Sequence, residues 1–242
     1  IEHLRSLVSW MRKHLPEYAA LLNENDIFKL RMKKIAQMDL TGAMTFGVTG
    51  PRLRGTEFEW DLRKSQPYCG YEDYEFESVT WEGEDSYAAF RIRLQECYES
   101  LRIVEQCMEK LERTEGQPIM VADAKIAWPA SLSLGSDGQG NSNEHIKHIM
   151  GESMEALIHH FKLVTEGFKV PVGQVYQAIE SPKGELGVHV VSDGGTRPYR
   201  AHLRDPGFHH LQSAPIMCEG GMMSDVVVAL ASLDPVLGGV DR

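Results

Sequence analysis

One long amphipathic segment, residues 85–113, constrains the fold of this chain more than any other feature of its sequence. Seven apolar residues lie on one face of such a helix, at intervals of three and four positions: Phe90, Leu94, Cys97, Leu101, Val104, Met108 and Leu111. Charged residues occupy the other face, and Gly116 and Pro118 end the segment. Because a helix of this length must bury its apolar face, the sequence predicts a bundle of long helices.

Two other segments have the same helical periodicity. Residues 3–22 predict an amphipathic helix, which Pro16 is expected to kink or split because proline lacks an amide hydrogen and clashes with the preceding turn. Residues 144–165 predict a second long helix, after a polar, glycine-rich loop. The aromatic and acidic segment 56–82 has no helical period, and we expect an irregular stretch with a short strand near 74–79.

The sequence texture changes after residue 170. Short segments rich in β-forming residues alternate with turns and predict a small antiparallel meander: 174–179, 187–192 and 198–203. Residues 222–233 then predict a buried helix, because almost no polar face remains. The sequence therefore predicts an α+β fold in three parts: a long-helix bundle over 1–170, a β-meander over 174–203, and a C-terminal helix with a tail over 220–242.

Charge and motif content exclude several classes of protein. The chain carries 25 Lys and Arg against 35 Asp and Glu, a net charge of −10, and an acidic chain binds nucleic acid poorly. No apolar run in the sequence is long enough to cross a bilayer. No cysteine stands in a C-x-x-C pair and no glycine run has the order of a nucleotide-binding loop. Because the sequence begins with Ile1 rather than Met, we expect a fragment, a processed product or an incomplete chain.

Histidines and polar turns are the remaining candidates for chemistry. His145 and His148 stand three residues apart, as metal ligands on one helix face can, but no third ligand completes a known spacing. Histidines on a helix surface are therefore favoured over a metal site. Lys183 and Glu185 lie in one turn of the meander and Arg197 in the next. Surface ion pairs are the simpler interpretation of both turns.

The tail, residues 234–242, has two interpretations that the residues leave open. It carries two acids and an arginine on a glycine-rich backbone, as a frayed terminus would. It also follows a segment that is apolar on all sides, so the tail is expected to begin next to a buried helix.

Several stretches resemble one family, in order along nearly the whole chain: LRG (53–55), WDLRKSQPY (60–68), SLRIVEQC (100–107), ESMEALIHHFKLVTEG (152–167), ESPKGELGVHVVSDGGTRPYR (180–200), DPGFHHL (205–211) and APIMCEGGMMSDVVVALASLDPVLGGVDR (214–242). The family is the 49 kDa-type, or D-type, subunit of respiratory complex I, the proton-pumping NADH:quinone oxidoreductase. The chain resembles the carboxy-terminal part of that subunit. Since the family is related to the large subunit of nickel–iron hydrogenases, the resemblance implies a hydrogenase large-subunit-like fold with its amino-terminal part missing.

The resemblance is informative at the run from Asp234 to Gly239. Hydrogenases of this kind end near Asp-Pro-Cys-x-x-Cys, whose thiolates hold the metals, whereas Val236 and Gly239 stand here in place of the cysteines. Valine and glycine cannot donate a thiolate, so no metal is expected at this end of the chain. The resemblance implies that the former metal pocket is an apolar chamber for quinone reduction, shared with a neighbouring subunit that carries an iron–sulfur cluster.

The family motif assigns the quinone pocket to five residues of this chain: Asp234, Val236, Leu237, Asp241 and Arg242. Lys183, Glu185 and Arg197 receive supporting roles. The family usually has Glu where this chain has Gly239, so no carboxylate is assigned there. The resemblance implies that the His and Tyr contacting the quinone headgroup belong to the family's amino-terminal half, so no catalytic residue is assigned to this chain.

The function implied by the resemblance is that of a peripheral-arm subunit that contributes part of the quinone-reduction pocket. Quinone is the expected substrate, this chain is expected to hold no cofactor, and alone it is expected to be inactive. The expected partners are the cluster-bearing B-type and C-type subunits and the membrane-arm H-type subunit, with NAD bound elsewhere in the complex. The expected place is the cytoplasmic face of a bacterial membrane, or the matrix side in a mitochondrion.

Two alternatives stand beside this function. One is a structural subunit of a related membrane-bound hydrogenase, or of a ferredoxin- or deazaflavin-linked complex, with a vestigial pocket. The other is an isolated α+β domain that binds a small apolar ligand. The exposed aromatic residues expected in 58–81 and the apolar segment 222–233 favour a chain with partners over an isolated domain.

Overall fold

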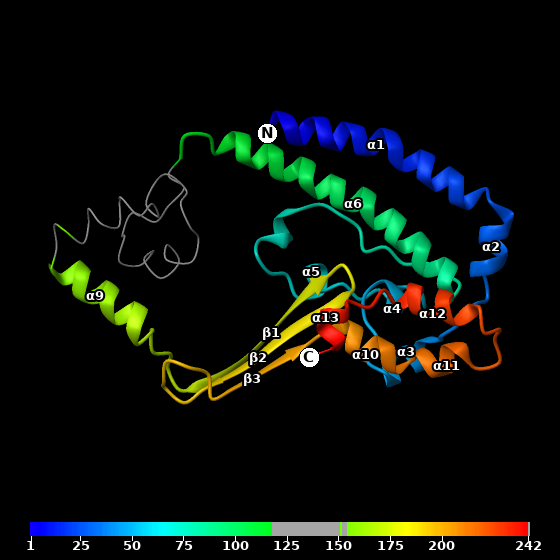
Figure 1. The fold of residues 1–242 in the computed structure, drawn as a ribbon. Helices are drawn as coiled ribbons and strands as arrows, with labels where there is room; N and C mark the ends of the chain where they lie inside the picture. Colours follow the sequence, from blue (N-terminus) through cyan, green and yellow to red (C-terminus); the bar gives the residue numbers. More distant parts are fainter. Residues whose placement is uncertain (118–150, 152–153, 242) are drawn as a thin grey trace. The chain divides into compact units, whose positions relative to one another are not determined.

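The computed structural model describes residues 1–117, 151 and 154–241 (Figure 1). It confirms the α+β class, because helices are combined with a three-stranded antiparallel sheet. The chain divides into two compact units. The first unit comprises residues 1–113, 176–189 and 202–242, and the second comprises residues 114–175 and 190–201.

Helices make up most of the first unit: α1 (Glu2–Asn23), α2 (Asp26–Met32), α3 (Leu40–Thr45), α4 (Pro51–Arg54), α5 (Leu62–Ser65), the 3-10 helix η1 (Tyr71–Asp73), α6 (Ser86–Arg113), α10 (Pro206–Gln212), α11 (Ala214–Cys218), α12 (Asp225–Leu233) and α13 (Leu237–Val240). In the described part of the second unit, the helix is α9 (Met154–Thr165). The predicted helix over 85–113 is confirmed as α6, with the same carboxy-terminal boundary.

The two longest helices, α1 and α6, lie side by side and bury their apolar faces against each other (Figure 1). One buried cluster joins them: Val8 and Leu15 from α1, and Leu101 and Met108 from α6. At the edge of this contact, Arg12 and Glu105 form an ion pair at 2.6 Å, and Arg5 pairs with Glu112. The periodicity of both segments therefore corresponds to one shared helix–helix core.

Pro16 lies inside α1, which continues unbroken from Glu2 to Asn23. The expectation that proline would split this helix is wrong. Pro16 is exposed, so water can hydrogen-bond the carbonyl that proline leaves without an amide partner. Val8 and Leu15, which both precede this position, pack against α6.

A second buried cluster joins the amino-terminal segments of the first unit to its last helices. Its buried members are Ala36, Met38, Ala43, Val48, Leu53, Met217, Ala229 and Leu233. These residues come from α3, α4, α11, α12 and the loops before them. The end of α12, and therefore the start of the tail, is anchored in this core through the fully buried Leu233.

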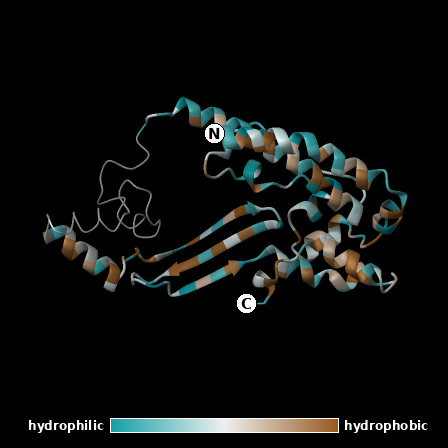
Figure 2. Cartoon of the chain, turned by 45° about the horizontal axis from the view of Figure 1, so that its top comes forward, coloured by the Kyte–Doolittle hydropathy of each residue, from teal (hydrophilic) through white to brown (hydrophobic). Residues whose placement is uncertain are grey.

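The sheet has the strand order β1–β2–β3, with β1 over Gly173–Ser181, β2 over Gly184–Ser192 and β3 over Arg200–Arg204. The predicted meander is confirmed, with a first strand longer than expected. Only Pro182 and Lys183 connect β1 to β2. Hydrophobic and hydrophilic residues follow one another in short bands along the strands (Figure 2), as expected for a sheet that is only partly covered.

The expected strand near 74–79 does not form. The main chain there bonds to side chains of α6 instead of to another strand. Gln106 accepts a hydrogen bond from the Glu75 amide at 2.9 Å and donates one to the Glu75 carbonyl at 2.7 Å. The Glu77 amide donates to Glu99 at 2.9 Å. Side chains of a helix thus replace a partner strand.

The segment 222–233 is a helix only from Asp225, and it is buried on one side only. Met223 is 92% exposed and Val227 is also exposed, whereas Ala229 and Leu233 are buried. The expectation of a helix buried on all sides is therefore wrong. Apolar composition alone did not reveal which face of this helix the core would cover.

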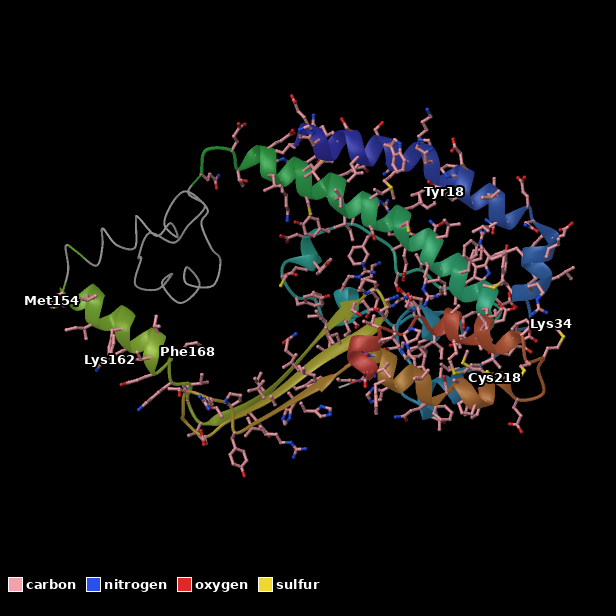
Figure 3. The ribbon with its side chains drawn as sticks, in the orientation of Figure 1. Tyr18, Lys34, Met154, Lys162, Phe168 and Cys218 are labelled. Atoms are coloured by element: carbon pink, nitrogen blue, oxygen red, sulfur yellow. The ribbon has the colours of Figure 1, made fainter. Side chains whose placement is uncertain are left out.

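The described part of the second unit carries α9 and the turn between β2 and β3. Met154, Phe168 and Lys162 all project to solvent (Figure 3). The predicted start of the long helix at residue 144, and the histidines at 145 and 148, lie outside the described residues. In the part of the chain that the structure describes, no helix has the length and apolar character needed to span a membrane.

Candidate functional site

A cleft of about 580 Å³ opens in the first unit between α6 and the turn that joins β1 to β2. One wall is mostly apolar: Met11, Cys97, Leu101, Val104 and Pro182. The opposite end is charged: Arg63, Arg93, Glu96, Glu180, Lys183 and Asp234. An apolar wall with a few convergent polar groups is typical of a small-molecule site.

Two glycines fix the β1–β2 turn to the loop before α4. A Cβ added to Gly50 would lie 2.6 Å from the Cα of Gly184, and one added to Gly184 would lie 2.5 Å from the hydroxyl of Thr49. Both glycines have positive φ, +69° and +137°, which other residues adopt only with strain. The Glu185 amide also donates to the Thr49 hydroxyl at 2.9 Å. The turn residues are therefore held in a fixed position against α4.

Arg54, at the end of α4, lies beneath the charged end of the cleft and is 2% exposed. Its guanidinium contacts Glu96 of α6 at 2.5 Å and Glu180 of β1 at 2.8 Å, and it donates to the Trp60 carbonyl at 2.9 Å. Burial alone would lower the pKa of Arg54, but the two carboxylates outweigh that effect and raise it. The arginine therefore stays charged and joins three segments of the chain.

Asp234 lies at the same end of the cleft, directly after α12. It has the left-handed backbone conformation, with φ +52°, as the residue that caps the carboxy-terminal end of the helix. Its carboxylate contacts Lys183 at 2.5 Å and Arg93 at 3.8 Å. Arg93 also donates to the Ser232 carbonyl at 3.0 Å. Burial lowers the pKa of Arg93, and the charge of Asp234 opposes that shift. Two predicted residues, Asp234 and Lys183, are thus in direct contact.

The other predicted pocket residues that the structure describes lie outside the lining of this cleft: Val236 directly before α13, Leu237 at its start and Asp241 directly after it. Val236 is 48% exposed and Leu237 is 76% exposed, and Asp241 is exposed too. Arg242 lies outside the described residues. The structure therefore divides the predicted set into Asp234 in the cleft and an exposed group on the tail.

Gly239, where the family pattern has Glu, is packed against Asp205, the residue directly before α10. A Cβ added there would lie 2.1 Å from a carboxylate oxygen of Asp205. Asp205 caps α10 by accepting a hydrogen bond from the Gly207 amide at 2.8 Å. A larger residue at position 239 would thus require Asp205 to move.

The supporting residues Glu185 and Arg197 are not among the residues that line the cleft. Glu185 accepts a hydrogen bond from the Tyr176 hydroxyl at 2.7 Å and lies 3.8 Å from Arg204. Burial and this bond raise the pKa of Tyr176 to about 12. Arg197 belongs to the second unit and is exposed.

Comparison with known proteins gives the family. The model of the family described as "Respiratory-chain NADH dehydrogenase, 49 Kd subunit" matches residues 1–242. The chain belongs to this family. The whole chain is 62% identical to the D-type subunit of the NADH-quinone oxidoreductase of a Nocardioides species and covers 54% of that protein. It is 64% identical to the corresponding subunit of Cutibacterium acnes, covering 56%, and 63% identical to one from Streptomyces griseus, covering 54%. The chain spans about half the length of the curated relatives it matches.

The structure of this member of the 49 kDa-subunit family offers few groups for a metal. Among the residues that the structure describes, no three His, Cys, Asp or Glu side chains are gathered as a metal site would require. At positions 236 and 239 the side chains are those of valine and glycine, neither of which can bind a metal. Metal ligation by these two positions is chemically ruled out.

Four charged residues that line the cleft were not predicted from the sequence: Arg63, Arg93, Glu96 and Glu180. The buried Arg54, which contacts two of them, was not predicted either. Arg54 and Glu180 stand inside the quoted family stretches LRG and ESPKGELG. The sequence signal that could have pointed to Arg54 and Glu180 is that both lie within family motifs. Their contact was not predictable from spacing, because 126 positions separate them.

Proposed function

We propose that this chain forms part of the quinone-reduction chamber of an NADH–quinone oxidoreductase and holds no redox centre of its own. The cleft between α6 and the β1–β2 turn carries this proposal, together with the family. Its apolar wall suits a quinone ring and its tail, and its charged end suits the carbonyl oxygens. Its size is that of sites that enclose a small organic ligand.

The ionic groups at the end of the cleft occur in compensated sets. Arg63 pairs with Asp61 at 2.6 Å, and Lys183 and Arg93 both contact Asp234. Arg54 lies between Glu96 and Glu180, so four cations face four carboxylates in total. Such pairs keep a low-dielectric site from carrying an uncompensated charge, and they supply N–H donors at fixed positions. A neutral quinone can therefore enter without displacing a lone ion.

The tail supports an extension of the chamber beyond the cleft. Asp234 is in the cleft, and Val236 and Leu237 follow it as exposed apolar residues. Exposed apolar side chains beside a ligand cleft are typical of a surface that another chain or a ligand covers. We assign the quinone pocket to Asp234, Val236, Leu237, Asp241 and Arg242, with Lys183, Glu185 and Arg197 in support.

The proposal extends to the partners and the surroundings of the subunit. The fold is that of the hydrogenase large subunit, and the remainder of the family's length supplies its amino-terminal part. Electrons reach the quinone from an iron–sulfur cluster on a neighbouring B-type subunit, with C-type and membrane-arm H-type subunits as further partners. The subunit lies at the cytoplasmic face of the membrane, or at the matrix side in a mitochondrion, as a peripheral part of the complex.

The test replaces two tail residues in the full-length subunit within the intact complex. Val236→Met adds bulk to the pocket, and Asp241→Asn removes a charge. We expect lower quinone reductase activity or a changed response to a quinone-site inhibitor. Added bulk of this kind costs about 1 kcal/mol or more of binding energy, which is roughly a fivefold shift in the inhibitory concentration.

Val227→Met is the matched control, because Val227 is another exposed valine, on α12 and outside the cleft and the tail. It should leave both activity and inhibition unchanged. If Val236→Met and Asp241→Asn also leave the kinetics unchanged in an assembled complex, the pocket assignment is wrong and a purely structural role is favoured.

A further inference from the structure

Two adjacent glycines of α13 differ sharply in what surrounds them. A Cβ added to Gly238 would meet no atom within 4 Å, whereas one added to Gly239 would lie 2.1–2.6 Å from all three atoms of the Asp205 carboxylate. Neither glycine has a positive φ, so the backbone at both positions is open to other residues. Glycine also weakens a helix relative to alanine. Gly239 therefore leaves room for the Asp205 carboxylate, which fills the place of a side chain.

Asp205 is itself held in a fixed position. It directly follows β3, whose last residue, Arg204, donates hydrogen bonds to the Glu185 carbonyl at 2.7 Å and to the Gly47 carbonyl at 3.0 Å. One carboxylate oxygen of Asp205 accepts a hydrogen bond from the Gly207 amide at 2.8 Å and so caps α10. The carboxylate on which the tail packs is therefore fixed to the end of the sheet and to the start of a helix.

The tail is thus held at two points. At its start, Asp234 is held by ion pairs at the charged end of the cleft. Near its end, Gly239 packs on the Asp205 carboxylate. Val236 and Leu237, the exposed apolar residues of the proposed pocket, lie between these two points. Their position therefore depends on both contacts.

We propose that Asp205 is a positioning residue of the quinone pocket: its carboxylate, seated beside Gly239, fixes the tail so that Val236 and Leu237 meet the quinone. This inference rests on the function proposed above and adds to it a residue from the connection between β3 and α10. Asp205 acts through the tail and touches no reacting atom. Its loss should weaken quinone binding and leave the chemical step unchanged.

The first test measures KM and kcat for reduction of decylubiquinone in the intact complex with the full-length subunit. Gly239→Ala places a methyl group where the Asp205 carboxylate lies, so the carboxylate or the tail must move. We expect KM to rise roughly fivefold, which corresponds to about 1 kcal/mol, with kcat nearly unchanged. Gly238→Ala is the matched control, because its methyl group meets open space, and it should leave both parameters unchanged.

Variants of Asp205 test whether its shape positions the tail. Asp205→Asn keeps the shape and the hydrogen bond from the Gly207 amide, so KM should stay near the unmodified value. Asp205→Ala empties the space beside Gly239 and should raise KM as Gly239→Ala does. When Asp205→Ala and Gly239→Ala are combined, the new methyl group has room, so KM should be no higher than in Asp205→Ala alone.

Three results would overturn the proposal. The first is a Gly239→Ala complex with the kinetics of Gly238→Ala. The second is a double variant in which the two increases in KM multiply, because that would show that positions 205 and 239 act independently. The third is an Asp205→Asn complex as impaired as Asp205→Ala, because the charge of the residue would then matter and its shape would not.

Hydrogen exchange of the tail amides in the intact complex separates failure of this proposal from failure of the proposed function. The amides of Gly239 and Asp241 donate to the carbonyls of Val236 and Leu237, at 3.0 and 2.8 Å. Asp205→Ala should speed their exchange roughly tenfold or more, because the tail loses one of its two points of attachment. Unchanged exchange contradicts the positioning role of Asp205 and leaves the proposed function standing. Faster exchange with an unchanged KM contradicts the pocket assigned to the tail, and with it the proposed function.

Discussion

His210 shows how strongly a single buried residue of this chain can respond to pH. Its side chain is almost completely buried, and its Nε2 accepts a hydrogen bond from the Thr49 amide at 3.1 Å. Burial, and then the charge of Arg204, lower the pKa of His210 from 6.5 to about 4, with Arg52 and Arg93 adding to the effect and the Leu233 main chain opposing it. The ring is therefore neutral in the folded chain at neutral pH.

This residue predicts an acid-sensitive component of stability. Below pH 6.5 the unfolded chain binds a proton at His210, whereas the folded chain does not until about pH 4. The stability contributed by the neutral His210 ring is fully present above the unfolded pKa of 6.5, and it is lost as pH falls from 6.5 to about 4. It amounts to about 3 kcal/mol. Urea unfolding should show the stability difference between the unmodified chain and His210→Gln shrinking by this amount on acidification.

His202→Gln provides the control for that experiment, because His202 is an exposed histidine of β3. Its stability difference from the unmodified chain should stay flat with pH. If the stability difference between His210→Gln and the unmodified chain is also independent of pH, the pKa of the buried ring is not lowered in the folded chain.

At the scale of elements, the two longest helices, α1 and α6, were predictable and the extended segment before α6 was not. The apolar residues of α6 recur on one face, so the sequence itself records which side the core covers. The segment 74–79 has β-forming residues, but its main-chain partners are Gln106 and Glu99, which lie 31 and 22 positions later. No local pattern contains that information, so a strand was the natural and incorrect expectation.

The same contact predicts how this segment is held. Gln106→Ala removes both the acceptor for the Glu75 amide and the donor to its carbonyl. Two net hydrogen bonds of this kind contribute about 1–2 kcal/mol. We expect the Glu75 amide to exchange its hydrogen roughly tenfold faster in the variant, while the amides of α6 keep their protection.

Gln95→Ala is the control, since Gln95 is an exposed glutamine of the same helix. It should leave exchange at Glu75 unchanged. Equal exchange at Glu75 in Gln106→Ala and in the unmodified chain would mean that other contacts hold the segment.

At the scale of the whole molecule, the family stretches contain segments that form the cleft, but they do not show which charged residues contact one another. The cleft is lined by residues of α1, α5, η1, α6, the β1–β2 turn and the position after α12. The buried Arg54 contacts residues 42 and 126 positions away. The motif identified Lys183 and Asp234 separately, and their contact at 2.5 Å is a property of the assembled chain. Long-range ion pairs are set by tertiary packing, which neither composition nor spacing records.

Arg54→Met tests whether this buried network holds the first unit together. The methionine fills much of the space of the arginine but leaves Glu96 and Glu180 without their counter-charge, which costs about 3–5 kcal/mol in buried ion pairs. Chemical unfolding should show that loss.

Because the cost is the stranded charge rather than lost volume, adding Glu96→Gln and Glu180→Gln to Arg54→Met should recover most of it. Arg113→Met, which breaks a pair with Glu109 in which both side chains are exposed, should stay within about 0.5 kcal/mol of the unmodified chain. A triple variant as unstable as Arg54→Met would show that the arginine stabilises the fold through its packing and its bond to Trp60, not through the carboxylates.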